Sequence, residues 1–190
     1  KSRLRAVATA TTIAALFLAI GGVPMTLSGA VEATTLEGAT QTIARGPVAA
    51  FVAIKQLGTN GGGFFGPNSA HPLENPTFWT NVISNVCILM IPMASVWMFG
   101  RISKRMAHAN VVFVVMMLMF IVLVGYANYC EQQPAMALSE LPVTSQSNLE
   151  GKELRFGSAA GPTWAVATTA TSNGSVNAMH DSLNPLTGLA

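Results

Sequence analysis

Two glycine-bearing stretches hold the residue types in this sequence that could do chemistry. They read Gly58-Thr59-Asn60-Gly61-Gly62-Gly63 and Thr171-Ser172-Asn173-Gly174-Ser175. Glycine allows backbone angles that turn successive carbonyl oxygens in one direction, and it keeps side chains out of a narrow lumen. Carbonyls gathered at the C-terminal end of a helix attract cations. The two stretches therefore predict a cation site made of main-chain oxygens, with no catalytic side chain.

An apolar segment precedes each stretch and would position it. Residues 47–57 and 162–170 both begin with proline, which suits the first turn of a helix. At about 1.5 Å per residue each helix would cross about half a bilayer, so we expect both to be re-entrant. Non-helical backbone at that depth must be buried in protein or line a watery cavity. We therefore expect the filter loops 58–63 and 171–175 to face a pore.

An internal repeat relates the two regions. The pattern Asn-x-x-His-x-x-x-Asn-Pro occurs at 68–76 and again at 177–185, after each glycine-bearing stretch. Duplicated units of span, half-helix, loop and span are a design of transporters and channels. We therefore predict one pore unit over residues 1–109 and a second, incomplete unit over 110–190.

Composition indicates an integral membrane protein. The 190 residues are 51% hydrophobic and 9% charged, whereas a soluble domain has roughly 25% charged residues. Three stretches are long and apolar enough to cross a bilayer, at about 6–27, 80–99 and 111–127. The expected fold class is all-α integral membrane, with repeated span–pore helix–filter loop–span units. A net charge of +2 gives no indication of a nucleic-acid partner.

Basic residues set the expected direction of the spans. Lysine and arginine gather before the first span and in the link 100–109, and neither segment contains an acid. The positive-inside rule places both segments in the cytoplasm, so segments 28–79 and 128–190 are predicted to be external. The first span also has the features of a secretory signal, and that alternative leaves the same topology for the rest of the chain.

Four strings distributed over most of the chain lie at 58–65, 68–76, 149–157 and 178–182. Together they resemble the KdpA family, whose members are potassium-binding subunits of the Kdp potassium-transporting ATPase. The resemblance implies a pseudo-fourfold, potassium-channel-like pore of the Trk/Ktr/HKT potassium transporter superfamily. It also implies that this chain is a fragment that holds the second pore unit and most of the third.

The resemblance further implies where potassium binds. Two triplets would present backbone carbonyls to the dehydrated ion, namely Thr59, Asn60 and Gly61, and Ser172, Asn173 and Gly174. Five neighbours would support these filters, namely Gly58, Gly62, Gly63, Thr171 and Ser175. Potassium would be the substrate and the only metal, and this chain would bind no cofactor.

The implied function is that of the potassium-binding and translocating subunit of a high-affinity, ATP-driven uptake complex. ATP and Mg would bind to a partner, the catalytic subunit of P-type ATPase class, and accessory Kdp subunits would complete the complex. The expected location is the plasma membrane of a bacterium or archaeon, in contact with the lipid bilayer.

Three more residues are expected to have structural roles. His71 and His180 recur at one place in the repeat, which favours bracing of the loop over metal binding, because no third ligand has suitable spacing. Lys55 lies three positions before Gly58, where an unpaired cation would repel potassium. We expect Lys55 to pair with an acid outside this chain or to hold a carbonyl oxygen.

Two alternative functions are weighed against this one. A stand-alone Trk/Ktr-type transporter or channel, driven by ion gradients, would use the same pore without an ATPase partner. A membrane-embedded enzyme would use His71 with Glu74, or His180 with Asp181, and would bind no potassium. ATP-dependent potassium uptake distinguishes the first alternative, and loss of activity in histidine variants would indicate the second.

Overall fold

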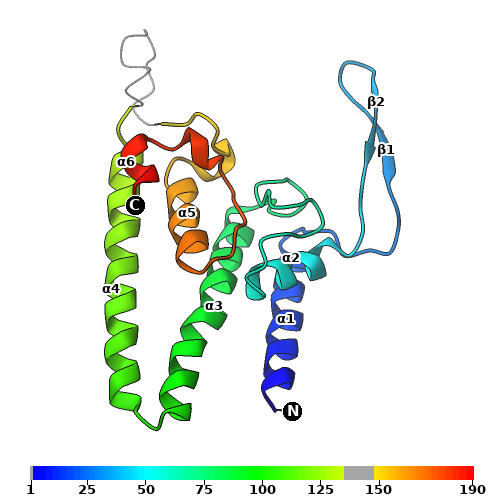
Figure 1. Ribbon diagram of the computed structural model, residues 1–190. Coiled ribbons are helices and arrows are strands. Elements are labelled where there is room, and N and C mark those ends of the chain that lie inside the picture. Colours follow the sequence, from blue (N-terminus) through cyan, green and yellow to red (C-terminus); the bar gives the residue numbers. More distant parts are fainter. Residues whose placement is uncertain (1, 135–147) are drawn as a thin grey trace.

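The computed structural model describes residues 2–134 and 148–190, with the backbone alone for residues 2 and 3. This part of the chain is mostly helical (Figure 1). Its two longest helices, α3 (Phe78–Ile102) and α4 (Met106–Glu131), lie side by side and are joined by a short turn. They form the scaffold that the shorter elements pack against.

Helices α3 and α4 are long and apolar enough to cross a membrane, judged by length and composition. On α4 the apolar side chains of Val114, Leu118 and Ile121 are each at least 60% exposed. A helix that is apolar on all sides and exposed along its length suits a lipid environment, because water would make that surface costly. The two helices are consistent with a membrane protein, and the predicted spans 80–99 and 111–127 lie within them.

The first helix, α1 (Ser2–Ile20), ends earlier than the sequence analysis predicts. The predicted span continues to residue 27, but the chain turns directly after Ile20, where Gly22 has a φ of +99°. A Cβ on Gly21 would lie 2.5 Å from Thr80 Cγ2, so this turn packs directly on α3. Among the described residues only α3 and α4 qualify as candidate spans.

The expectation of an all-α chain is wrong between residues 31 and 43. Strands β1 (Val31–Thr34) and β2 (Thr40–Ile43) pair as an antiparallel hairpin. Five of the eight strand residues are valine, isoleucine or threonine, which favour extended backbone, and Gly38 closes the turn with a φ of +84°. The hairpin projects away from the helices (Figure 1), so it does not position the site.

Two half-length helices pack inside the scaffold. Helix α2 (Val48–Leu57) packs against α1 and α3, and α5 (Ala160–Ala170) packs against α4 and α3. Leu18 and Cys87 join the buried side of α2, whereas Ile88 joins Trp164 of α5 in a second cluster. Since α3 contributes to both clusters, it fixes the two half-helices relative to each other.

In the described part of the chain three short elements flank α5, one before it and two after it. They are the 3-10 turns Leu154–Phe156 and His180–Ser182 and helix α6 (Pro185–Gly188). In Figure 1 they lie at the same end of the molecule as the C-terminus of α4, above α5. They therefore cover the end of the scaffold that is opposite to the α3–α4 turn.

Candidate functional site

The first glycine-bearing loop leaves α2 through a defined turn. Thr59 N donates to Gln56 O at 3.3 Å, and Asn60 N donates to Lys55 O at 3.4 Å. Thr59 itself has a φ of +47°. This pair of bonds with a left-handed residue between them is the Schellman ending of a helix, which glycine usually makes.

The second loop leaves α5 through the same turn. Ser172 N donates to Thr169 O at 3.2 Å, and Asn173 N donates to Thr168 O at 2.9 Å. Ser172 has a φ of +57°. Both loops thus place a hydroxyl residue where the left-handed backbone costs roughly 1–2 kcal/mol. Strain of this kind is retained where the surroundings enforce it, and it is common at functional sites.

The two turns lie in direct contact. Gly61 and Gly174 have φ values of +69° and +86°. A Cβ on Gly61 would overlap the carbonyl oxygen of Asn173 and would lie 3.0 Å from the carbonyl carbon of Gly174. The structure therefore brings the predicted triplets 59–61 and 172–174 together, with backbone against backbone.

The asparagines of the two triplets differ in burial. The Asn173 side chain is 3% exposed, and its Nδ2 donates to Lys55 O at 3.3 Å and to Gln56 O at 3.4 Å. Asn60 is exposed, and its side chain makes no hydrogen bond within the described residues. The Asn173 amide thus ties the second loop to the end of α2, whereas the Asn60 amide is exposed.

The residues predicted to support the loops occupy distinct positions. A Cβ on Gly58 would lie 2.7 Å from Ile54 O, and one on Gly63 would lie 2.7 Å from Lys55 Cδ, whereas Gly62 has open space at this position. Thr171 Oγ1 donates to a carbonyl one turn earlier in α5, at 2.8 Å. Close packing therefore demands glycine at 58 and 63.

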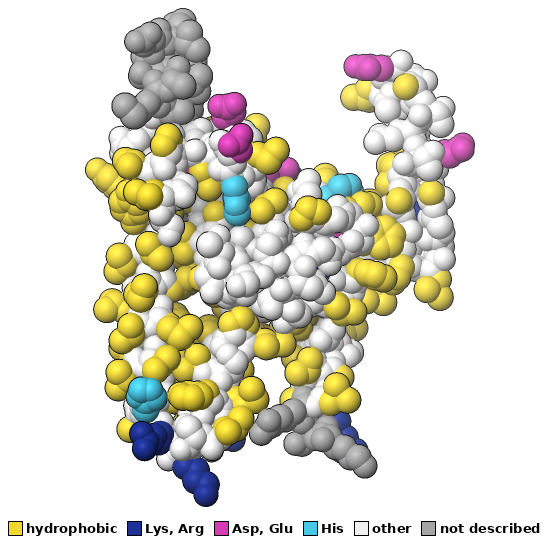
Figure 2. Space-filling view, viewed as in Figure 1, with side chains coloured by type: hydrophobic (Ala, Val, Ile, Leu, Met, Phe, Trp, Pro, Cys, Tyr) yellow, Lys and Arg dark blue, Asp and Glu magenta, His cyan; other side chains and the backbone are white. Residues whose placement is uncertain are grey.

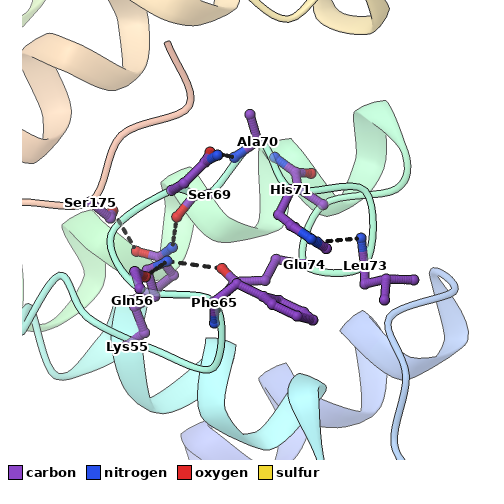
Figure 3. Close-up of polar contacts among 12 residues, drawn as sticks. Lys55, Gln56, Phe65, Ser69, Ala70, His71, Leu73, Glu74 and Ser175 are labelled. Atoms are coloured by element: carbon purple, nitrogen blue, oxygen red, sulfur yellow. Dashed lines mark hydrogen bonds and ion pairs between the residues drawn. The ribbon is translucent and has the colours of Figure 1, made fainter. Parts of the chain in front are cut away.

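Lys55 is fully buried, and it has partners inside this chain. Its Nζ lies 2.9 Å from Glu74 Oε2 and donates to Gly66 O at 2.8 Å, and Phe65 N donates to Glu74 Oε1 at 3.0 Å (Figure 3). The expectation of an acid outside the chain is wrong, because the segment after the first glycine-bearing stretch folds back and places Glu74 beside Lys55. The expectation that Lys55 holds a carbonyl agrees with the Gly66 bond.

A second buried ion pair lies at the C-terminal end of α4, and the sequence analysis missed it. Lys152 Nζ lies 2.7 Å from Glu131 Oε2, and both side chains are 1% exposed. Glu131 also accepts hydrogen bonds from Asn148 Nδ2 and from Asn184 N. An acid directly after a long apolar segment is the sequence signal that could have pointed to it.

The two repeated histidines have different surroundings. His71 Nδ1 accepts a hydrogen bond from Leu73 N at 3.1 Å, and the ring stacks on Phe65 with centroids 3.8 Å apart. Burial lowers the pKa of His71, and the charge of Glu74 opposes that change only in part. His180 lies exposed on its 3-10 turn. A shared bracing role for the two histidines stays a prediction.

Arg155 connects the second region to the loop of the first. Its Nη1 donates to Asn75 O at 3.0 Å, and its Nη2 donates to Ala70 O at 2.7 Å. Its Nε lies 3.1 Å from Glu153 Oε1. This hydrogen bond lowers the pKa of Glu153. The arginine therefore joins segments that lie far apart in the sequence.

Comparison with known proteins gives a consistent family. The sequence model of one protein family, "KdpA: Potassium-transporting ATPase A subunit", matches residues 2–190 of this chain. The "Potassium-transporting ATPase potassium-binding subunit" of Pseudomonas aeruginosa is 52% identical over 175 residues, which are 92% of this chain and 31% of that protein. The subunit of the same name from Rhodospirillum centenum is 47% identical over 178 residues, 93% of this chain and 31% of that protein. The chain thus spans about a third of the length of the curated relatives it matches.

Proposed function

This chain belongs to the family of the potassium-transporting ATPase A subunit, and we propose that it binds and translocates potassium within a high-affinity, ATP-driven uptake complex. Its relatives are named as potassium-binding subunits of that ATPase, which supports this function over a stand-alone transporter driven by ion gradients. A partner of P-type ATPase class would hydrolyse ATP with Mg, and accessory subunits would complete the complex.

The observation that carries the proposal is the contact between two matching turns at the ends of two half-helices. Moving an ion out of water costs about 20 kcal/mol in the idealised limit. Potassium filters offset that cost with rings of carbonyls from four loops, which replace the hydration shell. The triplets 59–61 and 172–174 would supply two of the four loops, and the rest of a full subunit would supply the others.

The distribution of charge supports a direction in the membrane. Figure 2 shows Lys and Arg side chains gathered at one end of the molecule and Asp and Glu side chains at the other. Arg101, Lys104 and Arg105 are exposed at or next to the turn between α3 and α4. By the positive-inside rule this end would face the cytoplasm of a bacterial or archaeal cell, and both filter loops would open towards the outside.

Uptake by the complete complex tests the proposal. A potassium-uptake-deficient strain carrying the complex should grow at very low external potassium, and growth should require cellular ATP when the membrane potential is maintained. Gly61→Ala should lower the apparent potassium affinity by roughly tenfold or more, because a side chain there would displace the Asn173 carbonyl.

Gly125→Ala is the matched control, because Gly125 lies on α4 with no atom within 4 Å of a Cβ placed there. It should insert, assemble and transport as the wild type does. Normal uptake by the Gly61→Ala complex would contradict the filter assignment, and uptake that persists without ATP would favour a gradient-driven transporter.

A further inference from the structure

One buried amide lies behind the contact of the two filter loops. Gln56, in the last turn of α2, is 1% exposed. Its Oε1 accepts a hydrogen bond from Ser175 Oγ at 3.0 Å, and its Nε2 donates to Ser69 Oγ at 3.0 Å (Figure 3). A single side chain therefore joins the end of α2, the segment after the second filter triplet and the segment after the first glycine-bearing loop.

Ser175 is itself fixed to the second half-helix. Trp164 Nε1, from the middle of α5, donates to Ser175 O at 3.0 Å, and Asn173 Oδ1 accepts from Ser175 N at 2.9 Å. Trp164 is fully buried. Since Gln56 belongs to α2 and Ser175 is held by α5, the bond between their side chains helps to hold the two proposed filter loops at their spacing, together with the Asn173 amide.

The connection closes into a ring of bonds. Ser69 N donates to Val176 O at 2.6 Å, and Val176 N donates to Pro67 O at 3.0 Å. Val176 follows Ser175 directly in the chain. Hydrogen bonds therefore lead from Gln56 to Ser69 and from Ser69 to Val176, the peptide chain leads on to Ser175, and a last hydrogen bond leads from Ser175 back to Gln56. A closed path of this kind resists changes in distance better than a single bond does.

Burial makes this arrangement hard to replace. Ser69 and Ser175 are 2% and 0% exposed, so water cannot substitute for a lost partner. A buried polar group without a partner is costly, and a fully paired network therefore favours one geometry. Selectivity among monovalent cations depends on the size of the cavity and on the number and field of its carbonyls. The spacing of the two loops would affect the size of that cavity.

We propose that Gln56 is a specificity-determining, positioning residue, which sets the spacing of the two filter loops through Ser175 and Ser69 and thereby selects potassium by ionic size. The inference rests on the proposed function, since it assigns a role in the same filter. Gln56 does not touch the ion, and it acts through the backbones that it holds.

The test uses the complete purified complex with three variants. Gln56→Met keeps the size of the side chain and removes both bonds, Ser175→Ala removes one hydroxyl, and Thr163→Val is the matched control. Thr163 Oγ1 accepts from Asn128 Nδ2 at 3.0 Å, so the control removes a bond between α4 and α5 and leaves the link between the loops intact.

Apparent affinities for potassium, rubidium and sodium are measured from ATPase activity and from the rise in unfolding temperature that each ion produces. Gln56→Met and Ser175→Ala should each change the potassium-to-rubidium or potassium-to-sodium affinity ratio by roughly tenfold. The double variant should change the ratio no more than Gln56→Met does, because both substitutions break one connection. Thr163→Val should lower the unfolding temperature and leave the ion affinity ratios unchanged.

Wild-type ion ratios in Gln56→Met or Ser175→Ala would overturn the inference, as would a changed ratio in Thr163→Val. If Gln56→Met does not assemble, Ser175→Ala decides, since it removes only one oxygen atom. Failure of the proposed function is distinguishable, because the wild-type complex itself would then show no potassium-dependent ATPase activity and no potassium-dependent rise in unfolding temperature.

Discussion

The two proposed filter loops share a backbone turn and differ in what holds them. Behind the first loop the support is ionic, since Lys55 and Glu74 pair beneath the Phe65–Gly66 segment. Behind the second loop the support is neutral, since the Trp164 indole and the Asn173 amide bind the backbone. A common main-chain geometry can therefore be kept while the side chains around it diverge, which would make the proposed pore only approximately symmetric.

The segments that follow the loops differ in the same manner. The first copy of the Asn-x-x-His-x-x-x-Asn-Pro pattern contains its own buried acid, Glu74, whereas the second copy has Leu183 at the equivalent place. The second copy instead binds Glu131 from the end of α4, through Asn184 N. One buried carboxylate serves each segment, but only the first acid belongs to the repeat.

Removal of Glu74 should have the largest effect on this comparison. Glu74→Ala leaves Lys55 as an unpaired buried cation behind the first loop, which should cost about 3–5 kcal/mol of unfolding free energy. Potassium affinity should fall as well, since the loop loses the acceptor of Phe65 N. The measurement is denaturant unfolding of the purified complex together with potassium-dependent ATPase activity.

The double variant Lys55→Met/Glu74→Leu is the control, because loss of both charges should restore most of the stability that the single change removes. If Glu74→Ala unfolds as the wild type does, the ionic support of the first loop is incorrect.

Substitution of Gly61 and of Gly174, the positive-φ glycines of the two triplets, should give the next largest difference between the loops. Gly61→Ala combines left-handed strain with overlap at the Asn173 carbonyl, whereas a Cβ on Gly174 has no atom within 4 Å. Gly174→Ala should therefore cost only the strain, about 1–2 kcal/mol. Potassium titration of both complexes should show the greater loss of affinity for Gly61→Ala, and equal losses would mean that the loops do not touch.

The asparagines of the triplets give a third contrast. Asn173→Ala removes the bonds to the α2 carbonyls from a buried position, which should cost about 1–3 kcal/mol. Asn60→Ala changes an exposed side chain and should alter stability by less than about 0.5 kcal/mol. Thermal unfolding of the complexes checks both values. A large effect of Asn60→Ala would indicate that Asn60 binds a part of the complex outside this chain.

The smallest expected effect concerns pH at the first loop. Burial lowers the pKa of His71 below its ordinary value of about 6.5, so the unfolded chain binds a proton before the folded chain does. Stability should thus be fully present above pH 6.5 and should decrease as the pH falls below it.

Comparison of unfolding midpoints at pH 7.5 and pH 5.5 (roughly one unit on either side of the ordinary histidine pKa) checks this, with His71→Phe as the control. The variant should lose part of the difference between the two midpoints, and an unchanged difference would assign the pH dependence to other groups.

Local sequence alone accounted for much of the fold. The apolar segments within α3 and α4 predict helices, because only a helix satisfies its own backbone over such a length in lipid. The loops after α2 and α5 were also predictable, since the sequence around Gly61 and Gly174 ends each half-helix. The hairpin β1–β2 was missed although its β-branched residues and Gly38 are local signals too.

By itself, therefore, the sequence determined the apolar helices, the two half-helices and the turns that end them, because each depends on residues within a few positions of one another. Only the tertiary structure decided that Glu74 neutralises Lys55, that Glu131 neutralises Lys152 and that Ser175 reaches Gln56. Such pairs carry no local signal, because the partners meet only after the half-helices have packed on α3 and α4. The physical reason is that a buried charge or amide selects its partner by proximity in the folded chain and not by spacing along it.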